Sequence, residues 1–146
     1  MAVAGPAEAT PEECESAEAV GRELGSRGVV VVCGGLGGVM EAACRGAKKA
    51  GGTTVGILAG VDRSDANRYV DVAIPTGLGQ ARNAVIVRAG DALIAIGGGY
   101  GTLSEIALAL RHEKHVVGLG TWDVDGVVTV DSPEAAVESV LGDLTT

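Results

Sequence analysis

Short apolar runs alternate along the chain with longer stretches of helical pattern. The runs are nearly continuous rather than alternately apolar and polar, which is typical of parallel strands covered on both faces. A clipped run at Ala2–Ala4 and a weak one at Val127–Val130 extend the set at its two ends. The five clear strand predictions are Val29–Cys33, Thr54–Leu58, Val70–Ile74, Ala92–Ile96 and Val116–Leu119.

The helical stretches carry start signals. In a capping box, Ser or Thr precedes the helix and Glu or Gln follows three residues later, and Pro is favoured at the first helical position. Thr10 with Glu13 fits this pattern before the first long helix, and Thr102 with Glu105 fits it again. Ser-Pro at 132–133 opens the last helix in a similar way.

Strands and helices in this alternation predict the fold class. Further helices are expected from about residue 38 to 50 and from about 79 to 89, each followed by glycine. The pattern indicates an α/β fold, a single doubly wound and mostly parallel Rossmann-like sheet with helices on both faces, forming one domain over residues 1–146. Ligands of such sheets bind beyond the carboxyl ends of the strands, near the point where strand order reverses.

Two glycine-rich loops follow predicted strands and precede predicted helices. Glycine lets a ligand approach the backbone, and the helix that follows offers unpaired N–H groups and a partial positive charge. Both loops are therefore candidate phosphate sites, although neither matches the Walker or dinucleotide fingerprint and no acidic residue is placed to read a ribose. The candidate ligand-binding residues are Gly34, Gly35, Gly37 and Gly38 in the first loop and Gly97, Gly98, Gly99, Tyr100, Gly101 and Thr102 in the second.

Three polar side chains near these loops are further candidates. Arg82 falls in the first turn of its predicted helix, where a cation opposes the helix dipole, and such a local conflict is expected at functional sites. The alternative is a solvated surface arginine whose helix starts elsewhere. Asn83 beside it could bind a ligand or cap the helix. Glu105 could cap its helix, act on a ligand, or do both. His112 and His115 are spaced by three residues rather than the four of the zinc signature, so no metal site is predicted.

Composition narrows the classes of partner. The formal net charge is −8, which argues against nucleic-acid and membrane-surface binding, because both need clustered Lys and Arg. The three cysteines are odd in number and form no C-x-x-C pair, which is typical of a reduced intracellular protein and favours a cytoplasmic location. No secretion signal or membrane-spanning run is predicted.

The two loops carry a family resemblance. "GGGYGTLSE" resembles the P-G-G-x-G-T-x-x-E motif of the Lonely Guy group of Rossmann-like proteins, often labelled "possible lysine decarboxylase", and "GGLGGVMEAACRGAKKAGG" resembles that group's G-G-x-x-G-L-M-G segment. The resemblance extends from about Val29 to Leu119. It implies that Arg82 and Glu105 take the positions of the catalytic Arg and Glu of the phosphoribohydrolases, and that the protein forms a homodimer or a larger homo-oligomer.

Two departures from the phosphoribohydrolases point to a neighbouring branch. Asn83 stands where they carry Lys, and Gly97 where they carry Pro. Both features are similar to the molybdenum-cofactor carrier-protein-like group, in which the implied role is binding of a phosphate-bearing pterin, with the molybdenum cofactor as the ligand. A decarboxylase is excluded on chemistry, because a pyridoxal enzyme needs a Schiff-base lysine and no lysine adjoins either loop.

Two functions therefore remain open from the sequence. The favoured one is a binding protein for a nucleotide-like or pterin phosphate. The alternative is a hydrolase that cleaves the N-glycosidic bond of a nucleoside 5′-monophosphate, in which Arg82 would hold the ligand and Glu105 would stabilise the transition state or position water.

Overall fold

A computed structural model describes residues 1–145 of the chain, with side chains through Leu144. Two short 3₁₀ turns, η1 (Arg63–Asp65) and η2 (Gly79–Ala81), accompany the helices and strands. The strands are β1 (Ala2–Ala4), β2 (Val31–Cys33), β3 (Thr54–Leu58), β4 (Val72–Pro75), β5 (Leu93–Ile96), β6 (Val116–Leu119) and β7 (Val128–Thr129). The helices are α1 (Pro11–Ser26), α2 (Val39–Lys49), α3 (Arg82–Ala89), α4 (Tyr100–Arg111) and α5 (Pro133–Thr145).

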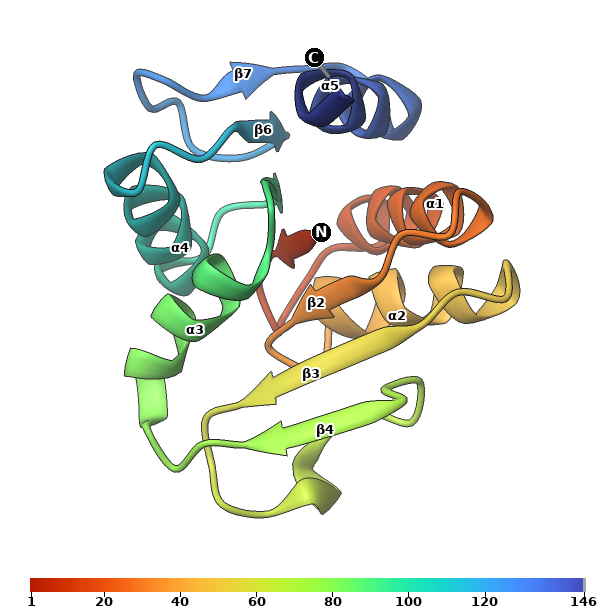
Figure 1. Cartoon of the computed structure of the whole chain (residues 1–146), viewed down its shortest axis with the longest axis vertical. Helices are drawn as coiled ribbons and strands as arrows, with labels where there is room; N and C mark the ends of the chain where they lie inside the picture. Colours follow the sequence, from red (N-terminus) through yellow and green to blue (C-terminus); the bar gives the residue numbers. More distant parts are fainter. Residues whose placement is uncertain (146) are drawn as a thin grey trace.

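The seven strands of residues 1–145 form one parallel sheet in the order β4-β3-β2-β1-β5-β6-β7. Helices α1, α2 and α5 cover one face, and α3 and α4 cover the other (Figure 1). This confirms the doubly wound Rossmann-like fold. Strand order reverses between β1 and β5, so the fold itself favours a ligand site at the carboxyl ends of these two strands.

The core is aliphatic and has two layers. In β5, Ile94 and Ile96 pack toward α1, α2 and α5, while Leu93 and Ala95 pack toward α3 and α4. Each strand at the centre of the sheet is thus buried on both faces, which explains its continuous apolar sequence. Within residues 1–145, no helix is both long and apolar enough to span a membrane.

The edge strand β4 departs from this pattern. Val72 is 47% exposed and Ile74 is 43% exposed. They pair with Val55 and Ile57 of β3 and so lie on the face that carries α3 and α4. The expectation that both faces of this strand are covered was wrong, because two helices do not reach the edge of that face. We call Val72 and Ile74 the β4 apolar strip.

Two of the three predicted helix starts are confirmed. In the box before α1, the N–H of Glu13 donates to Thr10 Oγ1 (3.1 Å) and the N–H of Thr10 donates to Glu13 Oε1 (2.9 Å). Before α5, the Ser132 hydroxyl oxygen accepts a hydrogen bond from the N–H of Ala135 (3.1 Å).

The predicted capping box at Thr102 and Glu105 was wrong. Helix α4 begins at Tyr100 with Gly99 as its N-cap, so Thr102 is already the third helical residue. Glu105 lies a turn further on and is buried. Gly99 has no side chain, so the helix start lacks a side-chain cap and its first N–H groups remain open.

Candidate functional site

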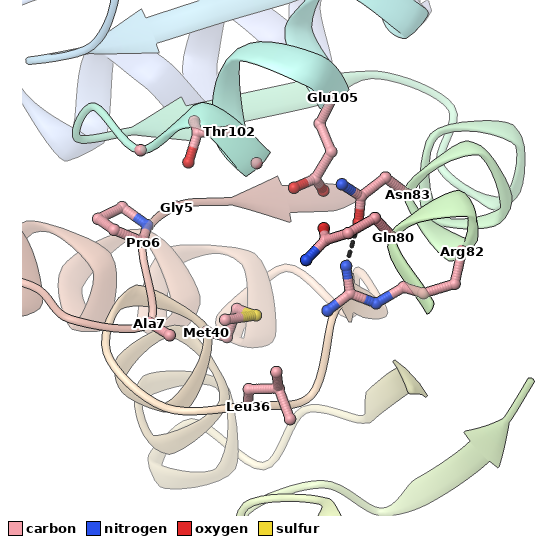
Figure 2. A pocket seen from close by; sticks show the side chains of 12 residues that line it. Gly5, Pro6, Ala7, Leu36, Met40, Gln80, Arg82, Asn83, Thr102 and Glu105 are labelled. Atoms are coloured by element: carbon pink, nitrogen blue, oxygen red, sulfur yellow. Dashed lines mark hydrogen bonds between the residues drawn. The ribbon is translucent and has the colours of Figure 1, made fainter. Parts of the chain in front are cut away.

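A cavity of about 250 Å³ lies at the reversal of strand order, between the ends of β1 and β5. Four loops and helix starts contribute to its wall (Figure 2). The lining residues are Gly5, Pro6 and Ala7 after β1, Leu36 and Met40 after β2, Gln80, Arg82 and Asn83 around the start of α3, and Gly99, Gly101, Thr102 and Glu105 around the start of α4.

Arg82 is the first residue of α3, in the first helical turn as predicted. Its side chain is only 7% exposed, and its guanidinium points toward the middle of the cavity (Figure 2). A Cβ at Gly34 would lie 2.6 Å from Arg82 Nη2 and 2.8 Å from Met40 Sδ, so glycine at 34 makes room for both. Arg82 Nε is buried without a hydrogen-bond partner among residues 1–145.

A chain of hydrogen bonds ties Arg82 to the first turn of α4. Arg82 Nη1 donates to Asn83 Oδ1, and Asn83 Nδ2 donates to the Ser104 hydroxyl oxygen (2.9 Å). The Ser104 hydroxyl in turn donates to the carbonyl of Gly101 (2.7 Å). Asn83 lies within α3 and does not cap it, and both polar atoms of its side chain have a partner in this chain of bonds. It links the guanidinium of Arg82 to Ser104 and so to the second glycine loop at Gly101.

The start of α4 has the features of an anion site. The N–H groups of Tyr100, Gly101 and Thr102 have no hydrogen-bond acceptor in the described part of the chain. The Thr102 hydroxyl is likewise buried and unpartnered, with the residue 2% exposed. Unpaired N–H groups and the helix dipole together favour a negatively charged group at this point.

Glu105 faces the same cavity and is 7% exposed. Its carboxyl group makes no hydrogen bond to any described residue. Burial raises the pKa of Glu105 to about 8, although the nearby positive charge of Arg82 pulls this pKa down. At neutral pH the group is therefore largely a neutral acid, which can donate a hydrogen bond and does not repel an anion.

The first glycine loop has a different environment. The N–H of Val39, at the start of α2, donates to the carbonyl of Pro6 (3.0 Å), so a backbone carbonyl of the chain already accepts the first N–H of this helix. Gly38 has a φ of +61°, and a Cβ there would lie 2.2 Å from Pro6 O. Close packing against the β1 loop thus accounts for glycine at this position.

The predicted residues fall into two groups. Arg82, Asn83, Gly99, Gly101, Thr102 and Glu105 line the cavity, and Gly34 abuts Arg82. The others, Gly35, Gly37, Gly38, Gly97, Gly98 and Tyr100, belong to the same two loops but do not line it. Sequence reasoning missed Gly5, Pro6, Ala7, Leu36, Met40 and Gln80. The Gly-Pro pair directly after the clipped first strand was the available signal.

The two histidines lie apart from the cavity. His112 Nδ1 is 3.3 Å from Arg88 Nη1, and His115 Nε2 is 3.1 Å from the Ser139 hydroxyl. Within the part of the chain that the structure describes, no group of three or more His, Cys, Asp or Glu residues could hold a metal ion.

Comparison with known proteins identifies the family of this chain. The model of the SLOG cluster4 family matches residues 1–141. The chain belongs to the SLOG cluster4 family. An uncharacterised protein of Archaeoglobus fulgidus is 44% identical over 138 residues, which cover 94% of this chain and 91% of that protein.

Two solved structures match this SLOG cluster4 chain over nearly the whole length of both proteins. The molybdenum cofactor binding protein from the phototrophic bacterium Rippkaea orientalis has a TM-score of 0.92 and 39% identity, over 99% of this chain and 96% of that one. The molybdenum cofactor carrier protein of Chlamydomonas reinhardtii has a TM-score of 0.91 and 34% identity, over 99% and 97%. The resemblance to the carrier-like branch of the Lonely Guy group is thereby confirmed.

Proposed function

We propose that this chain binds a phosphate-bearing small molecule, and that the ligand is the molybdenum cofactor or a similar pterin phosphate. The observation that carries the proposal is the convergence of three unsatisfied elements on one cavity: the open N-terminus of α4, Arg82 Nε and the Thr102 hydroxyl. Buried polar groups without partners are rare in folded proteins, so a ligand that satisfies all three is a direct explanation. Two relatives bear the name of a molybdenum cofactor binding or carrier protein, which supports this choice of ligand.

The cavity wall suits such a molecule at both ends. A phosphate fits the N–H groups of α4 and the guanidinium of Arg82, which prefers planar and charge-assisted contacts with phosphate oxygens. Leu36, Met40 and Pro6 lie across the cavity from Glu105 (Figure 2) and offer apolar contact to a ring. The amide of Gln80 supplies a further polar group to the cavity wall.

Replacement of Arg82 tests the proposal. Loss of one charge-assisted contact costs roughly 1.5–3 kcal/mol, so Arg82→Ala should weaken binding of a phosphate-bearing pterin about ten- to a hundred-fold. Arg88→Ala is the matched control, because Arg88 is on the same helix, is exposed, and lies outside the cavity. Isothermal titration would measure both. Equal affinity of wild type and Arg82→Ala would contradict the proposal.

One observation favours a second function, hydrolysis. A carboxyl group and a guanidinium share the cavity, as a hydrolase of nucleoside 5′-monophosphates would require. The raised pKa of Glu105 favours a proton donor over a charged stabiliser of the transition state. The assay is release of free base and ribose 5-phosphate from a panel of nucleoside monophosphates, for wild type and Glu105→Gln. Release that the variant loses would establish the hydrolase; no release by wild type would remove it for that panel.

We also propose a homodimer or larger homo-oligomer, a cytoplasmic location and no binding of nucleic acid. The β4 apolar strip supports self-association, because it exposes apolar surface at the edge of a sheet face that α3 and α4 do not reach. Light scattering at micromolar protein should report more than one chain per particle, and Ile74→Lys should lower that number. The net charge of −8 predicts no shift of single- or double-stranded DNA in a gel at physiological salt.

A further inference from the structure

The loop that follows β6 holds the second glycine loop by its carbonyl groups. The Thr121 hydroxyl donates to the carbonyl of Gly97 (2.6 Å), and the Trp122 indole Nε1–H donates to the carbonyl of Gly99 (3.0 Å). Neither Thr121 nor Trp122 lines the cavity between β1 and β5. Two side chains outside the cavity thus contact the backbone of a loop that forms part of its wall.

These contacts help to fix where the N–H groups of the loop point, and the carbonyl of Gly99 also accepts the N–H of Leu103 (3.0 Å). In a planar trans peptide the C=O of one residue and the N–H of the next point in opposite directions, and the described chain has no cis peptide bond. The N–H groups of Gly98 and Tyr100 therefore point away from Thr121 and Trp122. Among the described residues neither N–H has a hydrogen-bond acceptor.

The direction away from Thr121 and Trp122 is the side of the β1 loop, which lines the cavity, although Gly98 and Tyr100 are not themselves among the lining residues. In the sheet, β5 lies between β6 and β1, so the β6 loop and the β1 loop flank the glycine loop on opposite sides. Pro6, in the β1 loop, lies on the cavity side, and an added Cβ at Gly99 would come within 3.4 Å of Pro6 Cβ. Because the carbonyls of Gly97 and Gly99 are held on the β6 side, the N–H groups of Gly98 and Tyr100 point to the β1 side.

The indole is itself held in place. The ring of Tyr100, the first residue of α4, stacks on that of Trp122 with centroids 5.8 Å apart and planes at 28°. The stack packs the indole against the start of α4. Gly99, whose carbonyl accepts the hydrogen bond from the indole, directly precedes this helix. Such a pair restrains the Trp122 side chain without closing the cavity.

We infer that Thr121 and Trp122 are positioning residues for an anion: they hold the carbonyls of Gly97 and Gly99 so that the N–H groups of Gly98 and Tyr100 face a phosphate group at the start of α4. This inference rests on the proposed phosphate-binding function and assigns to the β6–β7 loop a part in it. Fixed donors bind an anion more tightly than mobile ones, because less ordering is needed on binding.

Inorganic phosphate is the probe, titrated calorimetrically at constant ionic strength. Thr121→Val removes the hydroxyl and keeps the shape, and Trp122→Phe removes the indole N–H and keeps a ring. Each should weaken phosphate binding about five-fold, the equivalent of one net hydrogen bond. Thr121→Ser keeps the hydroxyl and should bind as wild type does. A purely structural role predicts lower unfolding temperatures but unchanged affinity for the variants at a temperature where all are folded.

A spectroscopic readout accompanies the titration. Trp122 is the only tryptophan of the chain, so its emission in the wild type and in the Thr121 variants reports on the surroundings of the indole, which include the carbonyl of Gly99 and the ring of Tyr100. Phosphate should shift that emission with the same midpoint as the calorimetric curve. Binding to wild type that Thr121→Val and Trp122→Phe leave unchanged would overturn the inference alone. No phosphate binding to wild type would overturn the proposed function, and the inference with it.

Discussion

The buried carboxyl group of Glu105 should make the stability of the protein depend on pH in a defined way. Its pKa is raised from 4.5 to about 8, mainly by burial. Between these pH values the unfolded chain loses the proton while the folded protein keeps it. The folded state then binds more protons than the unfolded state, so stability falls as pH rises through this window and levels off above about pH 8.

The size of the effect follows from the linkage relation. Each pH unit within the window costs about 1.4 kcal/mol, and the whole window therefore about 5 kcal/mol. The isoelectric point is about 4.6, so solubility restricts the measurement to higher pH. From pH 5.5 to pH 8, the cost is about 3 kcal/mol by the same relation.

Glu105→Gln isolates this contribution because the amide has nearly the same shape and cannot ionise. Urea unfolding of both proteins, followed by circular dichroism, gives the difference in their free energies of unfolding at each pH. Other titrating groups cancel in that difference. The variant should gain on wild type by about 3 kcal/mol between pH 5.5 and pH 8. A difference that stays constant within about 1 kcal/mol over this range would refute the assignment of a raised pKa to Glu105.

Three further substitutions separate the fold from the site. Gly101→Ala should stabilise α4 by up to about 1 kcal/mol, since an added Cβ meets nothing within 4 Å, yet weaken phosphate binding by placing a methyl group on the cavity wall; Gly142→Ala, in α5, is the control that leaves binding unchanged. Gly34→Ala should displace the Arg82 guanidinium and weaken phosphate binding with the charge retained, as calorimetry would measure. Ser104→Ala breaks the bonds to Asn83 and Gly101, and should weaken phosphate binding about two- to five-fold without contact to the ligand.

The parts of the fold that follow from burial could be predicted from the sequence. Central strands such as β5 are apolar at every position because helices cover both faces, and this makes them easy to find. The position of Arg82 in a first helical turn was also predictable, and the conflict of a cation with the dipole there made Arg82 a candidate. Both signals are local, and each has one dominant physical cause.

The capping box at Thr102 and Glu105 shows why other features could not be predicted. A spacing of three residues places two side chains on one helix face whether the first is an N-cap or already helical. Gly99 decides between these cases, because its extended backbone (φ −83°, ψ 161°) lets the helix start at Tyr100. The sequence alone reveals neither that choice nor the burial of Glu105 that follows from it.

Tertiary contacts account for the remaining differences. Leu36 and Met40 line the cavity, but their types are those of ordinary core residues. Thr121 and Trp122 bind carbonyl groups in the loop that follows a different strand, β5. No local sequence pattern encodes such a contact. The exposure of the β4 apolar strip likewise depends on how far α3 and α4 extend over the sheet.

The most direct test of the central claim is to load the protein with the molybdenum cofactor and count phosphorus. The cofactor is released anaerobically from a molybdoenzyme, mixed with wild type or Arg82→Ala, and separated from free ligand by gel filtration. Phosphorus and molybdenum in the protein fraction are then measured by mass spectrometry. Wild type should retain phosphorus and molybdenum in equal amounts, and Arg82→Ala should lose both. No retention of either element by wild type, or equal retention of both elements by the two proteins, would contradict a phosphate site built on Arg82 and the start of α4.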